Sequence, residues 1–131
     1  MISLMRRITG IVLLLLLSFT LVTASASAVP IYGGREAIQA AQAADKPVMI
    51  SFFASWSGPS RFIAPLVDEL AAQKADNLKI ITVDVDEYKM LGAKYHIRSI
   101  PTFVLLNKDG EEVGRVRGAD LKGLENLLMD F

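Results

Sequence analysis

Apolar runs of strand length alternate with segments of helical composition along most of the chain. Three runs rich in β-branched and aromatic residues, 48–54, 78–85 and 102–106, predict buried strands. A fourth strand is expected over residues 112–116, because Asp109-Gly110 lies just before it and is typical of a hairpin turn. The sequence therefore predicts four strands, of which the last two form a hairpin.

The segments between these strands have helical composition or spacing. Residues 33–45 are rich in alanine and end before Pro47, and residues 86–95 predict a shorter helix. A long helix is expected to begin at Pro59 and to be kinked at Pro65. Its apolar residues repeat at helical spacing, at Phe62, Ile63, Leu66, Val67, Leu70 and Ala71. Asp120 is expected to cap a last helix whose apolar residues are Leu121, Leu124, Leu127 and Leu128.

The predicted order is helix, strand, helix, strand, helix, strand, strand, helix. Strands that are joined through a helix are expected to run parallel with right-handed crossovers, so that only the hairpin adds an antiparallel strand. This order predicts an α/β domain with a mixed central sheet and helices on both faces.

Residues 1–28 have the three-part pattern of a secretory signal peptide. Arg6 and Arg7 precede a mostly apolar run over residues 8–22, and small residues follow over 23–28. Cleavage is expected after Ala28, with Ala26 as the alternative. An uncleaved anchor is disfavoured, because the run falls short of the about 20 residues that a spanning helix needs. The expectation is an exported domain over residues 29–131, periplasmic or extracellular, with no membrane attachment once the signal is removed.

Composition narrows the possible chemistry. The chain has no cysteine, and residues 29–131 hold 12 basic against 14 acidic residues. This balance gives no reason to expect nucleic acid or an anionic membrane as a partner. We expect no metal or cofactor and a monomer, and a core that stabilises the domain without disulfides.

A motif at the end of the first buried strand carries a resemblance to a known family. The segment 51–65, which contains Trp56-Ser57-Gly58-Pro59-Ser60, resembles the active-site segment of thioredoxin, where Trp-Cys-Gly-Pro-Cys follows a strand and opens a proline-kinked helix. Residues 98–102 resemble the family's segment that holds a cis-proline, and Gly118 resembles the glycine that closes its substrate groove. The resemblance implies a thioredoxin fold over essentially all of residues 29–131.

The family's reaction depends on two thiols, and both positions are serine here. A thiolate at a helix N-terminus attacks a disulfide, and a second thiol resolves the mixed disulfide. Ser57 and Ser60 can do neither, so no catalytic residue is expected. The resemblance would also place a buried aspartate at Ser51 and its lysine partner at Thr82, and both are small hydroxyl residues here. Losing both is what a relaxed demand for proton transfer would permit.

Three functions stay open at this point. The favoured one is a redox-inactive domain that binds extended polypeptide or a protein partner in a groove formed by Trp56, Gly58, Pro59, Ile100, Pro101 and Gly118. The alternative is a serine variant of a thiol-disulfide oxidoreductase, and the third is a structural role with the groove unused. Ser57 and Ser60 are interpreted as helix-capping hydroxyls. His96 is interpreted as a surface residue away from the groove, so a Ser-His hydrolase is disfavoured.

Overall fold

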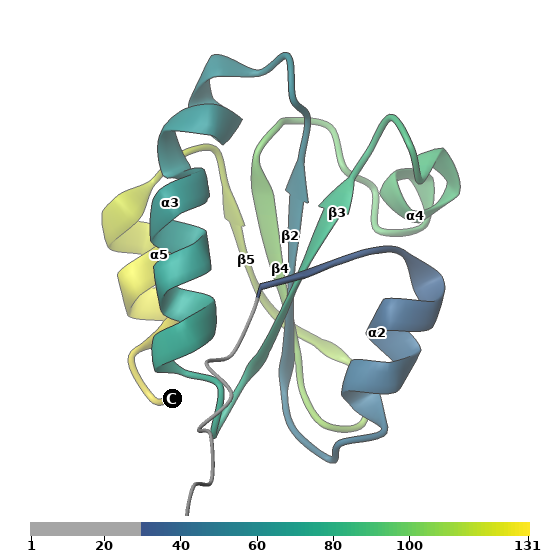
Figure 1. The fold of residues 1–131 in the computed structure, drawn as a ribbon, viewed down its shortest axis with the longest axis vertical. Coiled ribbons are helices and arrows are strands. Elements are labelled where there is room, and N and C mark those ends of the chain that lie inside the picture. Colours follow the sequence, from purple (N-terminus) through teal and green to yellow (C-terminus); the bar gives the residue numbers. More distant parts are fainter. Residues whose placement is uncertain (1–29) are drawn as a thin grey trace, which may run out of the picture.

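A five-stranded mixed sheet forms the centre of the computed structural model, which describes residues 30–131 (Figure 1). The strands are β1 (Ile31–Tyr32), β2 (Val48–Phe53), β3 (Lys79–Asp84), β4 (Thr102–Leu106) and β5 (Glu112–Arg117). Their order across the sheet is β1-β3-β2-β4-β5. The predicted signal peptide, residues 1–28, lies outside the described residues.

Helices cover both faces of this sheet, as the sequence predicts. They are α2 (Arg35–Gln42), α3 (Gly58–Gln73), α4 (Lys89–Lys94) and α5 (Leu121–Leu128). Helices α3 and α5 lie on one face, and α2 and α4 lie on the other (Figure 1). Within residues 30–131, no helix is both long and apolar enough to cross a membrane.

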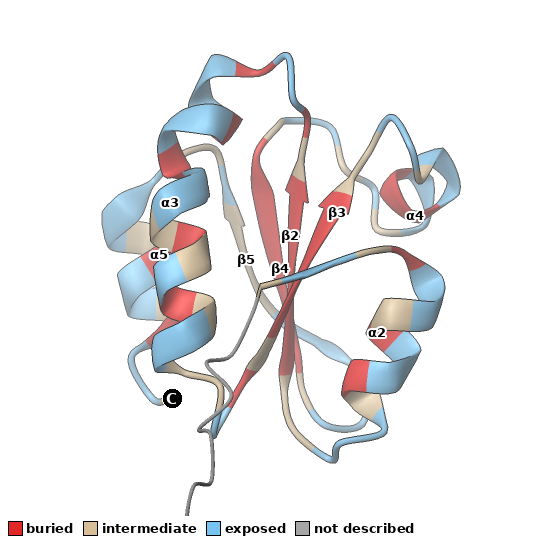
Figure 2. Ribbon diagram, in the orientation of Figure 1, coloured by how far each residue is buried: buried red, intermediate tan, exposed pale blue. Residues whose placement is uncertain are grey.

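The core consists of two apolar layers, one on each face of the sheet. Successive side chains of a strand point to opposite faces, so β2 places Ile50 in the layer under α2 and Met49 in the layer under α3. In β4, Val104 likewise lies in the layer under α2 and Phe103 in the layer under α3. Burial on both faces explains why β2, β3 and β4 have nearly continuous apolar sequences (Figure 2).

One expectation about strand direction is wrong. Strands β2 and β3 are parallel, but β4 follows a helix and is nevertheless antiparallel to β2. Helix α4 has six residues and is therefore about 9 Å long, too short to return along the sheet. The chain instead enters β4 at the end of the sheet where β3 stopped (Figure 1). The hairpin β4–β5 is antiparallel as predicted.

Other boundaries differ from the predictions by a few residues. The two-residue edge strand β1 was not predicted. Pro65 lies inside α3, where it removes one backbone donor, and α3 continues past it to Gln73. Phe62 is not part of the buried stripe of α3, because its side chain is 69% exposed, whereas Ile63 and Val67 are buried.

Candidate functional site

The serine motif lies where β2 ends and α3 begins. Ser57 is the N-cap of α3, and its hydroxyl oxygen accepts a hydrogen bond of 3.3 Å from the backbone N–H of Ser60. The Ser57 carbonyl accepts the first helical bond, from the N–H of Arg61. Gly58 and Pro59 form the exposed first turn, where proline loses no helical bond. Ser57 is therefore the helix-capping hydroxyl that the sequence predicts.

Ser60 has a different role from Ser57. Its side chain is 3% exposed, and its hydroxyl accepts the N–H of Ala54 at 3.4 Å, so it is not a second cap. Behind it lies a cavity of about 60 Å³. Ser51 and Thr82 line this cavity from opposite positions on the neighbouring strands β2 and β3. The two hydroxyl residues thus form a neutral pair where the resemblance implies an aspartate and a lysine.

The only charged group that lines this cavity is Asp68 of α3. Its Oδ1 accepts a hydrogen bond of 2.9 Å from the hydroxyl of Tyr32 on the edge strand β1. Partial burial raises the pKa of Tyr32 above its usual value of 10, and the hydrogen bond and the negative charge of Asp68 raise it further. Tyr32 therefore stays a neutral donor at physiological pH. Neither residue was singled out from the sequence, because no local pattern connects an edge strand with α3.

Trp56 is a mostly exposed side chain held in one place. It is 66% exposed, and its indole Nε1 donates a hydrogen bond of 2.8 Å to Oδ2 of Asp86, in the loop after β3. The ring presents an apolar surface to solvent while its polar edge is paired. Sequence reasoning missed Asp86, whose place beside the motif arises only from the parallel pairing of β2 and β3.

The second side of the site precedes β4. The Ile100–Pro101 peptide bond is cis, and Pro101 lines the same cavity as Ser60. The hydroxyl of Thr102 donates to the carbonyl of Ser99 at 2.7 Å and so holds this loop. Among the described residues, neither the N–H nor the C=O of Ile100 takes part in a backbone hydrogen bond.

Gly118 completes the arrangement from the end of β5. Its N–H donates to the carbonyl of Pro101 at 2.7 Å, and its φ of +81° lies in the left-handed region that favours glycine. The structure therefore brings Ser60, Pro101 and Gly118 together from three separate segments, with Trp56 at the start of the motif. His96 lies apart, exposed after α4, and is not among the residues that line the cavity behind Ser60.

Comparison with known proteins decides the family. The sequence profile of the thioredoxin family matches residues 35–130. The chain belongs to the thioredoxin family. It is 47% identical over 73 residues to thioredoxin 1 of Synechococcus elongatus, a match that covers 56% of this chain and 67% of that protein. It is 44% identical over 89 residues to an H-type thioredoxin of Oryza sativa, covering 68% of this chain and 71% of that one.

Solved structures agree with this assignment. Thioredoxin from Malassezia sympodialis superposes with a TM-score of 0.70 at 26% identity, over 83% of this chain and 96% of that one. A cysteine-to-serine mutant of Entamoeba histolytica thioredoxin superposes with a TM-score of 0.69 at 38% identity, over 78% and 99%. The thioredoxin fold and the mixed α/β sheet of this chain are thereby confirmed.

This member of the thioredoxin family has no sulfur at its motif. The chain contains no cysteine, so it has no thiol to attack a disulfide and none to form one. A serine nucleophile would need a base that accepts its O–H, and among residues 30–131 neither the Ser57 nor the Ser60 hydroxyl forms a hydrogen bond with a histidine, carboxylate or amine side chain. Within residues 30–131, no three acidic or histidine side chains gather as a metal site.

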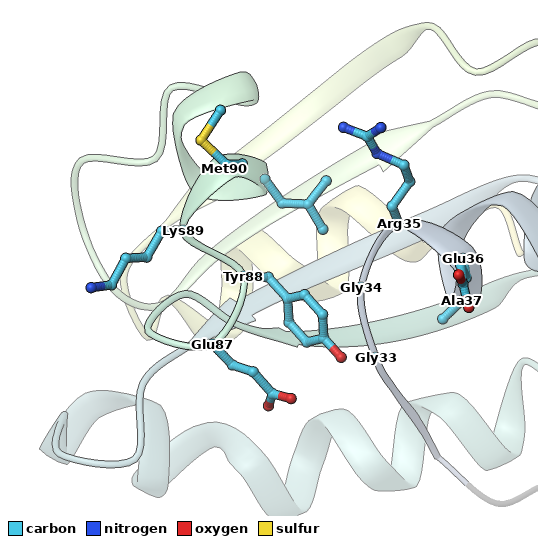
Figure 3. A pocket seen from close by; sticks show the side chains of 10 residues that line it. Gly33, Gly34, Arg35, Glu36, Ala37, Glu87, Tyr88, Lys89 and Met90 are labelled. Atoms are coloured by element: carbon cyan, nitrogen blue, oxygen red, sulfur yellow. The ribbon is translucent and has the colours of Figure 1, made fainter.

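A larger hollow lies elsewhere, between the start of α2 and the start of α4, with a volume of about 720 Å³. The ring of Tyr88 points toward the backbone of Gly33 and Gly34 there (Figure 3). A Cβ on Gly34 would overlap this ring, so the close approach requires glycine. The hollow shares no lining residue with the cavity behind Ser60. It is therefore separate from the serine motif.

Proposed function

We propose that this protein is a redox-inactive member of the thioredoxin family that binds extended polypeptide in the groove between Trp56 and Ile100. The observation that supports the proposal most is the backbone of Ile100, whose N–H and C=O form no backbone hydrogen bond among residues 30–131; the indole of Trp56 is exposed and held by Asp86. An extended peptide can pair with such a backbone as an added strand, while apolar neighbours receive its side chains. None of these contacts needs a thiol.

Exposed apolar side chains at the start of α3 suit such a ligand. Trp56 and Phe62 are large and mostly exposed, and Pro59 lies exposed between them in the sequence. Aromatic side chains supply most of the energy of many small interfaces, because they desolvate a large area with few rotatable bonds. An exposed cluster of this kind is costly unless it is covered by a partner.

A fluorescence experiment tests the proposal directly. Trp56 is the only tryptophan of the chain, so its emission reports on the groove alone. Short peptides with a Val-Ile-Val centre are expected to shift this emission saturably. The same peptides with an N-methylated central residue are expected to bind more weakly, because strand addition depends on main-chain hydrogen bonds.

A variant pair separates groove binding from general stickiness. Trp56→Ala should weaken the binding of a labelled Val-Ile-Val peptide, measured by anisotropy. Met129→Ala is the matched control, because Met129 is also large, apolar and exposed but lies at the far end of α5 (Figure 1). Binding that is unchanged by both Trp56→Ala and N-methylation would contradict the proposal.

The alternative function is a thiol-disulfide oxidoreductase carried here as its serine variant. It is favoured by the near-isosteric exchange at Ser57 and Ser60 in an otherwise intact motif. The fold does not distinguish the redox-inactive binding domain from the serine variant of an enzyme, since a cysteine-to-serine mutant of a relative has the same fold. Serine codons at both positions in the natural gene would exclude the enzyme, and cysteine codons would exclude our favoured proposal.

We further propose that the domain acts after export, in the periplasm or outside the cell, as a monomer. Support comes from the charged, apolar and small-residue pattern of residues 1–28. N-terminal sequencing of the protein from its natural source should begin at Val29, or at Ser27 if the alternative site is cleaved. An N-terminus at Met1 in the cytoplasmic fraction would refute export.

A further inference from the structure

A basic cleft lies beside β5. It has a volume of about 470 Å³ and is lined by His96, Arg98, Glu112, Arg115 and Arg117. Arg115 and Arg117 are two residues apart on β5, so their side chains leave the same face of the strand. Three arginines and a histidine thus gather around one carboxylate. This is a local excess of positive charge in a domain whose acidic residues outnumber its basic ones.

The one carboxylate of the cleft, Glu112, is already hydrogen-bonded to Arg115. Both oxygens of Glu112 accept hydrogen bonds from Arg115, through Nε and Nη2, and Nη2 also donates to the carbonyl of Tyr95 at 2.7 Å. Arg115 is therefore neutralised and fixed. Arg98 and Arg117 are exposed and form no salt bridge with any described residue. Their guanidinium groups are free to bind another carboxylate in the bidentate manner that suits arginine.

The backbones of the two free arginines lie close to Ile100 and Pro101. Arg98 precedes Ile100 by two residues. Arg117 is paired with Thr102 across β4 and β5, and the next residue, Gly118, donates its N–H to Pro101. A peptide that pairs with the backbone of Ile100 would therefore pass close to both arginine residues, whose side chains line one cleft.

We propose that the groove prefers extended peptides with acidic residues next to the segment bound at Ile100, and that Arg98 and Arg117 are the residues that select them. This inference rests on the proposed function, because it names the class of peptide that the same groove takes. The acidic side chains of Asp86 and Glu87 lie beyond Trp56, on the other side of the motif. They would repel acidic residues placed at that end, so the preference depends on which end of the peptide is acidic.

Matched peptides test the inference. The probes are fluorescein-labelled peptides with a Val-Ile-Val centre and three glutamates at one end, made in both orientations, with glutamine and lysine versions of each. In one orientation, the glutamate peptide is expected to bind about fivefold more tightly than the glutamine peptide. This factor is what two exposed ion pairs typically add to an affinity. The difference should vanish in about 1 M NaCl, where the screening length is only about 3 Å.

Charge-removing variants assign the effect to the cleft. Arg98→Gln/Arg117→Gln should abolish the preference for the glutamate peptide over the glutamine peptide. Lys108→Gln/Lys122→Gln removes two equally exposed charges elsewhere and should keep the preference. Equal binding of the glutamate and glutamine peptides overturns the inference but not the proposed function. Failure of every peptide to bind overturns both, and a glutamate preference that survives Arg98→Gln/Arg117→Gln overturns the role of the cleft.

Discussion

Replacing Ser57 by alanine should destabilise the domain by about 1 kcal/mol, the usual effect of losing an N-cap. The change removes the acceptor for the N–H of Ser60, which has no other acceptor in the described structure. Two features set the magnitude in opposite directions. The bond is long at 3.3 Å, which weakens it. Ser60 is only 3% exposed, however, so its N–H cannot easily find water instead.

Urea unfolding followed by far-ultraviolet circular dichroism measures this loss as a difference in the free energy of unfolding. A loss of about 1 kcal/mol corresponds to a fall in Tm of about 4–8 °C for a domain of about 100 residues. Ser55→Ala is the control, because Ser55 is exposed and two residues away; it should change the free energy by less than about 0.5 kcal/mol. Ser57→Thr keeps a capping hydroxyl and should retain most of the stability.

Equal stability of Ser57→Ala and the unchanged protein would refute the reasoning. The hydroxyl at position 57 would then have no structural role, and its retention in a buried position would need another explanation, such as contact with a ligand. A loss shared equally by Ser55→Ala would instead show that the whole loop, rather than the cap, sets the stability of the start of α3.

Three other changes have expected outcomes. Ser57→Cys/Ser60→Cys should give two titratable thiols and only weak dithiol-dependent reduction of a disulfide substrate, because Ser51 stands where the family resemblance implies an aspartate. Burial and the neighbouring carboxylate of Asp68 raise the pKa of Tyr32 in the folded state. The stability that Tyr32 contributes should therefore be complete below pH 10 and fall as the pH rises through this higher folded-state pKa. Tyr32→Phe should remove this fall in the free energy of unfolding, measured by urea unfolding at a series of pH values. Leu124→Ala should cost about 2–5 kcal/mol in urea unfolding, because Leu124 is fully buried between α5 and the sheet.

The sequence predicts the fold well where local composition and tertiary burial agree. The strand 102–106 is predicted to the residue, because five buried positions in a row leave little freedom of interpretation. Asp120 caps α5 as predicted, through a hydrogen bond to the N–H of Gly123. The strand β1 escapes prediction, since two exposed residues carry no periodic signal. Phe62 misleads for a different reason, because an apolar residue beside a buried stripe cannot be distinguished by sequence from a member of that stripe.

The candidate site is predictable only where its residues are adjacent in the sequence. The motif residues and Ile100-Pro101 each form one short segment that resembles the family's pattern. The partners Asp86, Tyr32 and Asp68 depend on strand pairing and helix placement, which no single segment encodes. The direction of β4 illustrates the same limit, since the length of α4, rather than its presence, decides whether the chain crosses back over the sheet.

The features that the motif has lost and those it has kept differ in physical kind. By the family resemblance, the lost ones are side-chain groups that react or move protons, at positions 51, 57, 60 and 82. The kept ones are mainly backbone features: the unpaired groups of Ile100, the Gly118-Pro101 hydrogen bond and the capped start of α3. Backbone contacts are stabilised by the sheet and by α3, so they do not depend on sulfur. Recognition can therefore outlast thiol chemistry in this fold, and the arginines at 98 and 117 would then determine which peptide is recognised.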